Sequence, residues 1–314
     1  MEIDTICMSG GGIIGISYIG ILDYLINKKY VDVNQIINFV GTSVGSIFIV
    51  LLSIGYTPLE IGEFIFNFNF TKLEFDVSID NIFQKHGINN GERFEFMLKS
   101  LIRRKIDIDN ISFIDLYKIN NKTIKIIGTN FTKCTEEVFS WDTTPQMPII
   151  TAIRISCSVP IIFTPVFYNN CWYIDGGMTN NFPINYCDKN KTLGLFIKYN
   201  NLNENISSIN NIAMGCINMV INNITTKDID TDFINCISIL CDGCDPVDLS
   251  LTNELKLKLI SNGQKLAIKF IDTYPKKVVE KIIDDIINLV DDNINLKYYD
   301  KTTQTDETEF LNIN

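Results

Sequence analysis

Short apolar runs alternate with longer amphipathic stretches along most of the chain. Runs with strand character cover residues 4–8, 36–40, 123–129, 137–141, 171–174, 192–199 and 233–241. Helical patterns cover residues 16–28, 46–52, 92–104, 148–156, 206–221 and 251–273, and a further helix is predicted to begin at Thr57-Pro58. Strands that alternate with helices build a parallel sheet covered on both faces. The pattern predicts an α/β fold of three layers, α/β/α, with a mainly parallel central sheet.

The alternation ends near residue 275. From residue 297 the chain is polar, Thr-rich and acidic, which is typical of a disordered tail. No internal repeat interrupts the earlier part. We therefore expect one catalytic domain over residues 1–275, followed over residues 276–314 by a C-terminal helix and a polar tail.

A GxSxG pentapeptide, Gly41-Thr42-Ser43-Val44-Gly45, joins the second predicted strand to the next helix. A strand, a serine between glycines and a helix form the context of a nucleophile elbow. Gly41 and Gly45 suit this turn because the strand and helix backbones approach too closely for a Cβ. On the pentapeptide alone, a small-residue turn in an ordinary α/β crossover remains open.

A glycine-rich loop, Gly10 to Gly15, follows the first predicted strand. It satisfies the dinucleotide fingerprint GxGxxG, yet the second strand ends in the Gly41-Thr42-Ser43 turn rather than in a ribose-binding acid. A phosphate loop is not predicted either, since no Gly-Lys-Ser/Thr follows. Glycines at a helix N-terminus still offer N–H groups and a positive dipole end to a developing oxyanion.

A serine nucleophile needs a base, and the chain has a single histidine, His86. An α/β-hydrolase triad places its histidine after the acid, so a triad of that order is excluded. His86 precedes a glycine turn and is expected in an exposed loop. Asp175 is the remaining candidate because it ends an apolar strand before Gly176-Gly177, at the sheet edge predicted for Ser43. A carboxylate near pKa 3.9 is a weak base unless burial raises its pKa.

Net charge and cysteine usage limit the partners. A formal charge of −10 argues against nucleic acid and gives no general attraction to an anionic membrane. The cluster Arg103-Arg104-Lys105 is interpreted as a solvated helix end. Nine scattered cysteines indicate reduced, mostly buried thiols, and the lone Cys241-Asp-Gly-Cys244 lacks further ligands for zinc. We expect no metal and no cofactor.

Two stretches without charge, residues 5–22 and 33–59, are long enough to cross a membrane. Glycines, serines and asparagine interrupt both, so strand–turn–helix units explain them better. The acidic start Met1-Glu2-Ile3-Asp4 does not resemble a signal peptide. We expect a cytoplasmic protein with peripheral, transient contact to membranes. Phe64, Phe66, Phe68, Phe70 and Phe75 are expected in the core, with an acyl-binding wall as the alternative.

Three blocks in order, Gly10 to Gly15, Gly41 to Gly45 and Asp175-Gly176-Gly177, resemble the patatin-like phospholipase family. The Ser-rich, Pro-bounded block at 154–165 is similar to a fourth block of that family. Further matches are Gly128-Thr129-Asn130, Asn180-Asn181-Phe182-Pro183 and the helix that contains Gly263, so the resemblance spans about residues 4–275. It implies a three-layer α/β fold that uses a Ser-Asp dyad and no histidine.

The resemblance also implies roles for single residues. Ser43 would be the acyl-accepting nucleophile, and Asp175 its base. The oxyanion hole would be formed by Gly10, Gly11 and Gly12 with the N–H of Val44, and support would come from Gly15, Gly41, Gly45, Gly176 and Gly177. The family commonly has Lys or Arg where Ile14 stands, so a cation at that position is not expected here.

Together these features predict a metal-independent acyl hydrolase that cleaves carboxylic esters of phospholipids or lysophospholipids through an acyl-enzyme. A neutral-lipid lipase or general esterase is the alternative among enzymes. A catalytically inactive lipid-binding homologue and a nucleotide-binding protein are the alternatives of other classes.

Overall fold

The computed structural model describes residues 2–73, 89–199, 209–227, 235–241 and 246–275. The chain divides into two compact units, Met1–Phe270 and Ile271–Asn314. Of the second unit only residues 271–275 are described, and they are helical. The expected helix and tail over 276–314 lie outside the described residues, so the proposed domain limits remain a prediction.

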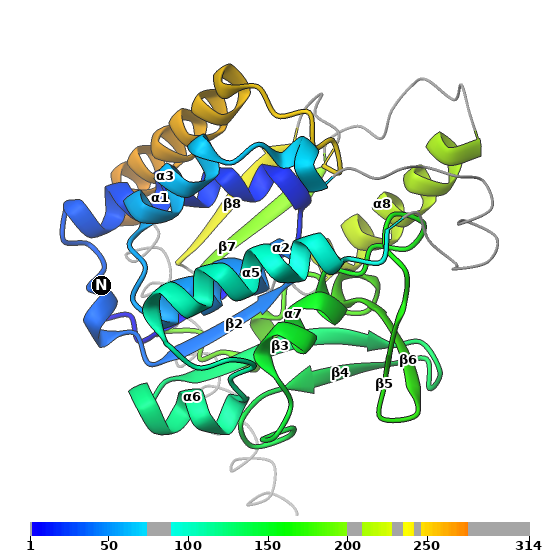
Figure 1. Ribbon diagram of the computed structural model, residues 1–314. Coiled ribbons are helices and arrows are strands. Elements are labelled where there is room, and N and C mark those ends of the chain that lie inside the picture. Colours follow the sequence, from blue (N-terminus) through cyan, green and yellow to red (C-terminus); the bar gives the residue numbers. More distant parts are fainter. Residues whose placement is uncertain (1, 74–88, 200–208, 228–234, 242–245, 276–314) are drawn as a thin grey trace, which may run out of the picture. The chain divides into compact units, whose positions relative to one another are not determined.

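The first unit contains one sheet (Figure 1). Its strands are β1 (Thr5–Met8), β2 (Asn38–Thr42), β3 (Thr123–Asn130), β4 (Thr135–Phe139), β5 (Val166–Tyr168), β6 (Cys171–Asp175), β7 (Thr192–Tyr199) and β8 (Cys236–Cys241). The strand order is β5-β6-β3-β2-β1-β7-β8, and β4 pairs with β3. β1, β2, β3, β7 and β8 run parallel, whereas β4, β5 and β6 pair in antiparallel fashion. The mainly parallel sheet expected from the sequence is confirmed, with an antiparallel arm added.

Helices cover both faces of this sheet. The labelled helices are α1 (Ser17–Asn27), α2 (Val44–Ser53), α3 (Pro58–Asn67), α5 (Glu92–Lys105), α6 (Phe113–Asn120), α7 (Ile149–Ser156) and α8 (Ile209–Lys227), with short 3-10 turns η1 (Gly12–Ile16), η2 (Val33–Gln35), η3 (Phe70–Leu73), η4 (Gly176–Met178) and η5 (Ile184–Tyr186). A further helix covers residues 253–275, close to the 251–273 expected from the sequence. The β1–β2 and β2–β3 connections step one way across the sheet, and the β7–β8 connection steps the other way. Right-handed crossovers then place α1 and α2 on one face and α8 on the other. The three-layer α/β/α fold is confirmed.

Local sequence explains several element limits. Thr57 and Glu60 form a reciprocal capping box at the start of α3, with Pro58 at its first position, as the sequence predicts. β4 begins and ends two residues earlier than expected. It ends at Phe139 because the Ser140 N–H donates to Thr143 Oγ1 at 3.1 Å and Thr143 Oγ1 donates to the Val138 carbonyl at 2.7 Å, which closes a turn.

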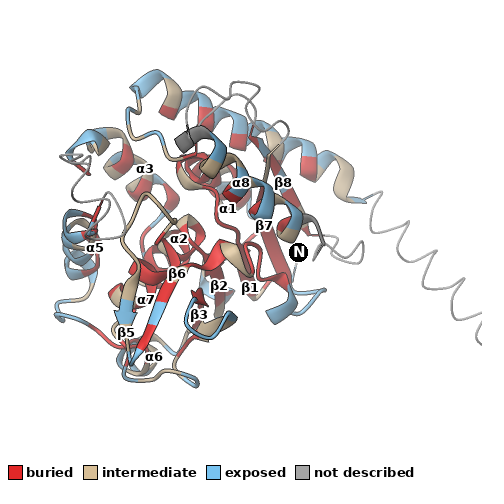
Figure 2. Ribbon diagram, turned by 90° about the vertical axis from the view of Figure 1, so that its right-hand side faces the viewer, coloured by how far each residue is buried: buried red, intermediate tan, exposed pale blue. Residues whose placement is uncertain are grey.

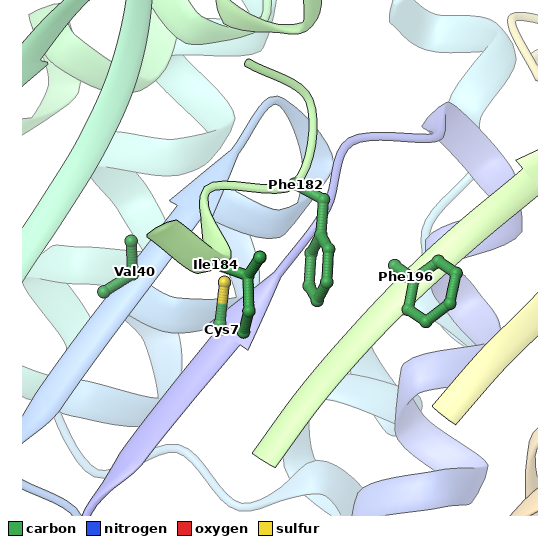
Figure 3. Packing of buried hydrophobic residues seen from close by; sticks show 5 residues of the cluster. All are labelled: Cys7, Val40, Phe182, Ile184 and Phe196. Carbon is green, nitrogen blue, oxygen red and sulfur yellow. The ribbon is translucent and has the colours of Figure 1, made fainter. Parts of the chain in front are cut away.

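The interior of the sheet is apolar. Figure 2 shows the strands β1, β2 and β3 as largely buried, while α5 and α6 carry exposed residues. In one buried cluster, Cys7, Val40 and Phe196 from three parallel strands pack against Phe182 and Ile184 (Figure 3). Burial raises the pKa of the Cys7 thiol, so it packs as a neutral, weakly polar group. The eight cysteines within the described ranges are free thiols.

Neither uncharged stretch forms a single helix. Residues 5–22 form β1, η1 and the start of α1, and residues 33–59 contain β2 and α2, as the sequence predicts. Within the described ranges, no helix is both long enough and apolar enough to cross a bilayer.

β2 and β6 share one edge of β3, and this arrangement brings their ends together. Ile126 and Ile127 of β3 pair with β2 and also with β4, so these two strands lie on opposite edges. The last three residues of β3 pair with β4 on one edge and with β6 on the other, so β6 lies on the same edge of β3 as β2. Thr42, the last residue of β2, pairs with Ile127, and Asp175, the last residue of β6, pairs with Gly128. The two strands therefore meet C-terminus to C-terminus.

Candidate active site

Ser43 is the single residue between β2 and α2. Its backbone has φ 50° and ψ −126°, a conformation that residues other than glycine rarely adopt. A Cβ at Gly45 would collide with the Met8 carbonyl oxygen, and one at Gly41 would lie 2.9 Å from the Gly45 carbonyl carbon. The GxSxG segment is thus a sharp strand-to-helix turn in which the glycines are required by space.

Both backbone polar groups of Ser43 are held by neighbouring serines. The Ser43 N–H donates to Ser156 Oγ at 2.8 Å, and Ser46 Oγ donates to the Ser43 carbonyl at 2.6 Å. Ser156 is the last residue of α7, far from Ser43 in the sequence. These hydrogen bonds offset the cost of the strained backbone. Ser43 is 8% exposed, and its side chain lies at the N-terminus of α2.

Asp175 lies opposite, at the end of β6, and is 2% exposed. Its N–H donates to the Ser158 carbonyl at 2.9 Å, and its own carbonyl accepts from Thr129 Oγ1 at 2.8 Å. Its carboxylate is fixed on one side only: Oδ1 accepts the Gly177 N–H at 2.7 Å, whereas Oδ2 has no hydrogen-bond partner among the described residues. A buried oxygen without a partner is rare and points to a functional role.

The surroundings of Asp175 make it a stronger base than a solvated carboxylate. Burial raises its pKa to about 7, although the Gly177 N–H and the nearby Ser43 hydroxyl both act to lower it. Such a group can accept a proton near neutral pH. The sequence could show that an acid ends this strand; it could not show the burial that raises its pKa.

The glycine loop lies beside Ser43. A Cβ at Gly10 would lie 3.0 Å from Ser43 Cβ. The Gly10 N–H donates to the Asn181 carbonyl at 3.1 Å, so it is already used and cannot also serve an oxyanion in this arrangement. The N–H groups of Gly11, Gly12 and Val44 donate to no acceptor within the described parts of the chain. Gly11 and Gly12 have φ of 154° and 55°, which favour glycine.

An apolar cavity of about 190 Å³ adjoins Ser43. Its wall is formed by side chains from α2, α3, η3, α5, the segment after α7 and residues 246–251. Phe64 and Phe70 line it, and none of Phe64, Phe66, Phe68 and Phe70 is fully buried. The expectation that these four residues form the core is therefore wrong: Phe64, Phe68 and Phe70 border open space beside α3, and Phe66 borders a separate concavity between α1 and α3. Phe75 lies outside the described residues.

His86 and Cys244 lie outside the described residues. Elsewhere in the described chain, no cluster of three or more His, Cys, Asp or Glu side chains could hold a metal ion. Ile14, in the glycine-rich loop, is buried at 2% exposure.

Sequence reasoning missed the residues that hold the site together. In the sequence, Ser156 and Ser158 are members of the Ser-rich block at 154–165, which assigns them no role. Asn181 was likewise noted without a role, yet its carbonyl accepts the Gly10 N–H and its Nδ2 donates to Thr225 Oγ1 at 2.9 Å. The signal was the grouping of polar residues beside Pro160 and Pro183, but no spacing rule links such residues to a serine more than a hundred positions away.

Comparison with known proteins finds matches in both sequence and fold. The family model described as patatin-like phospholipase matches residues 6–188. The probable lipid hydrolase 463L of invertebrate iridescent virus 6 is 38% identical over 190 residues, which cover 59% of this chain and 63% of that protein, less than two thirds of its length. The uncharacterized protein R571 of Acanthamoeba polyphaga mimivirus is 35% identical over 208 residues, which cover 65% of this chain and 68% of that protein.

Solved structures share the fold at low sequence identity. VipD from Legionella pneumophila superposes with a TM-score of 0.67 at 17% identity, covering 87% of this chain and 67% of VipD. ExoU from Pseudomonas aeruginosa, solved in complex with SpcU, gives a TM-score of 0.51 at 15% identity, covering 87% of this chain and 53% of that chain. With the family match extending over more than half of its residues, this chain belongs to the patatin-like phospholipase family.

Proposed function

We propose that this protein is a lipid acyl hydrolase that cleaves carboxylic ester bonds of phospholipids or lysophospholipids with a Ser43–Asp175 dyad. The observation that carries the proposal is the pairing of a strained serine with a buried carboxyl group of raised pKa, beside an apolar cavity. The name of the iridescent virus relative, a probable lipid hydrolase, supports the same class of activity.

The first step would be proton transfer from Ser43 to Asp175. Asp175 Oδ2, which has no partner in the described chain, accepts the proton of Ser43 Oγ as that oxygen attacks the ester carbonyl carbon. Oδ1 stays bonded to the Gly177 N–H, which keeps the carboxyl group in position. A pKa near 7 gives Asp175 useful basicity and still leaves much of it ionised at neutral pH.

The attack leaves negative charge on the former carbonyl oxygen. The N–H groups of Gly11, Gly12 and Val44 are the proposed donors, since each is unused within the described part of the molecule. The positive end of the α2 dipole adds to their effect. Fixed donors of this kind usually supply the largest single contribution to acyl transfer. We assign Gly10 to positioning, because its N–H is bonded to Asn181.

Collapse of the tetrahedral intermediate would break the ester bond. The alcohol leaves with the proton that Asp175 holds, and the acyl group stays on Ser43 Oγ. Asp175 then takes a proton from a water molecule, which attacks the acyl-enzyme, and the acid is released as Ser43 regains its proton. In this scheme the cavity would hold the acyl chain, because its lining offers apolar contacts along several elements.

The direct test is release of fatty acid from phospholipid vesicles by purified protein, with labelling by a fluorophosphonate. We expect Ser43→Ala to abolish labelling and to lower the rate by about 10³-fold or more. Asp175→Asn is expected to lower the rate to a similar extent, because an amide cannot accept the proton. Equal acid release by the wild type and Ser43→Ala would remove Ser43 from the mechanism.

Matched controls separate chemistry from folding. Ser53→Ala changes a buried serine at the far end of α2, and Asp107→Asn changes an exposed acid after α5. Both are expected to keep wild-type rates. A folded wild-type protein that binds vesicles but releases no acid from phospholipids, triacylglycerols or short soluble esters would instead be an inactive lipid-binding homologue.

A further inference from the structure

A second concavity lies on the outer side of the cavity wall. It has a volume of about 810 Å³ and lies between the C-terminal part of α3, η3 and α5. We call it the α3–α5 groove. Phe64, Leu73, Met97 and Leu101 line this groove and also line the cavity beside Ser43. The two spaces therefore adjoin and share these four side chains as a common wall.

α5 divides its residues between two faces. Phe94, Leu98, Leu101 and Ile102 are buried against the rest of the fold. Arg93, Phe96, Met97, Ser100 and Arg104 follow the spacing i, i+3, i+4, i+7, i+11 and line the groove. Phe96 is 73% exposed, the largest exposed fraction among the exposed large apolar side chains of the described chain.

The charge of the groove is opposite to that of the chain. The protein carries a formal charge of −10, yet the groove is lined by the cations Lys72, Arg93 and Arg104 and by one acid, Glu92. A neighbouring concavity on the α3 side is lined by two acids, Glu60 and Glu63, and by the cation Lys105.

The neighbouring cations differ in their partners. Arg103 lies 3.6 Å from both Asp107 and Asp109, and Lys105 bonds Glu60 at 2.8 Å. Lys72 and Arg104 are exposed and have no salt bridge to any described residue. The sequence predicts that the cluster Arg103-Arg104-Lys105 is a solvated helix end. In the structure Arg103 and Lys105 have acidic partners, whereas Arg104 lines the groove.

We propose that the α3–α5 groove is the surface by which this protein docks on an anionic phospholipid membrane. Lys72 and Arg104 contact headgroup phosphates, and Phe96 inserts at the level of the headgroups. The inference rests on the proposed function, because a lipid hydrolase must reach substrate in a membrane. Its support is charge complementarity in an otherwise acidic chain, combined with the shared wall between this groove and the Ser43 cavity.

Binding to vesicles tests the proposal without catalysis. The Ser43→Ala protein is sedimented with vesicles of phosphatidylcholine alone or of phosphatidylcholine mixed with phosphatidylglycerol. We expect binding mainly to the mixed vesicles, and weaker binding as salt rises. Adding Lys72→Gln and Arg104→Gln should weaken that binding by roughly fivefold for each removed charge.

Matched controls come from exposed residues elsewhere. Lys118→Gln with Lys133→Gln removes the same charge from α6 and the β3–β4 turn and should leave binding unchanged. Phe96→Ser should weaken binding, whereas Phe131→Ser, which removes an aromatic ring 61% exposed at the end of β3, should not. The melting temperature of each variant confirms that the fold is intact.

Three results would overturn the proposal. They are equal binding to both kinds of vesicle, an equal loss in the control pair, and a change of oligomeric state on Lys72→Gln and Arg104→Gln without a change in vesicle binding. The last result would assign the groove to a second copy of the chain. Because the assay uses the Ser43→Ala protein, loss of the docking surface is distinguished from failure of the proposed hydrolysis, which the acid-release assay measures separately.

Discussion

Ser156 Oγ accepts the N–H of Ser43 at 2.8 Å, and this bond joins the end of α7 to the turn between β2 and α2. Two residues later, the Ser158 carbonyl accepts the N–H of Asp175 at 2.9 Å. The end of α7 therefore holds both members of the proposed dyad through backbone groups. Arg154, 2% exposed, donates from one guanidinium nitrogen to Ser158 Oγ at 2.5 Å and fixes this segment in turn.

The Ser156→Ala variant should be less stable and less active. Removing the acceptor leaves the buried Ser43 N–H without a partner, which costs about 1–3 kcal/mol in the free energy of unfolding. It also frees a strained turn, so kcat should fall more than KM changes. Chemical denaturation and steady-state kinetics measure the two effects. In Ser53→Ala, a lost local bond to Val50 should lower stability only, and a fall in its kcat would contradict the positioning role of Ser156.

Activity should depend on pH through Asp175. This residue must be ionised to accept the proton, and its pKa is about 7. The value of kcat/KM should therefore rise about tenfold per pH unit below 7 and level off above it. A soluble short-chain ester provides the measurement without changes in vesicle charge. A profile that stays flat down to pH 5 would show that the base has an ordinary carboxyl pKa or is another group.

Asp175→Asn should be inactive, and above pH 7 its free energy of unfolding should exceed that of the wild type. In the folded chain the pKa of Asp175 is about 7, above the ordinary value of 3.8 expected after unfolding. Between these values the folded state binds more protons, so the carboxyl group lowers stability as pH rises through this window. Asparagine does not titrate and still offers an oxygen to the Gly177 N–H. The free energy of unfolding should exceed the wild-type value by about 1 kcal/mol or more at pH 8.

Ser43→Ala is the control for this stability effect. It removes catalysis but keeps the buried carboxyl group, so its unfolding free energy should retain the wild-type dependence on pH between 4 and 7. If Asp175→Asn and Ser43→Ala show the same dependence, the titrating group is not Asp175.

Ile47→Trp should change the preference for acyl chain length. Ile47 lies one helical turn after Ser43 on α2, lines the cavity and is half-buried. A larger ring there fills space beside the nucleophile. Hydrolysis of long-chain esters should fall by about tenfold or more relative to short-chain esters, because a chain that cannot enter loses its apolar contacts. Ile37→Trp, at a position 49% exposed, is the matched control and should keep the wild-type preference.

The sequence was sufficient to predict the three-layer fold, the turn at Ser43 and the candidacy of Asp175, because strand–glycine–helix patterns are local. It was not sufficient to predict why Asp175 lies beside Ser43. The sequence places Asp175 at the edge of a mainly parallel sheet where Ser43 is predicted, whereas β6 is antiparallel to β3. Apolar alternation marks a strand but carries no information about its direction, which depends on pairing with residues far away in the sequence.

The phenylalanines of α3 and η3 illustrate a second limit. Composition favours burial of Phe64 and Phe70, and both do contact other apolar groups. Their half-exposed state follows from the spacing between α3, η3 and α5, which only tertiary packing sets. The same holds for Gly10: a glycine before a helix suggests a free N–H, and only the path of residues 180–181 shows that this one is taken.

Because β2 and β6 meet on one edge of β3, some segments of the chain must keep their length for Ser43 and Asp175 to stay close, and others need not. The β3 backbone sets the spacing between Ser43 and Asp175. Thr42, which precedes Ser43, pairs with Ile127, and Asp175 pairs with the next residue, Gly128. The chain between α2 and Thr123, or the turn between β3 and β4 at residues 131–134, can lengthen or shorten without altering that spacing. The end of α7 cannot, because Ser156 and Ser158 bond the backbones of Ser43 and Asp175. A one-residue deletion inside β3 would instead shift the pairing of β2 relative to that of β6 by about 3.3 Å and so change the distance between Ser43 and Asp175.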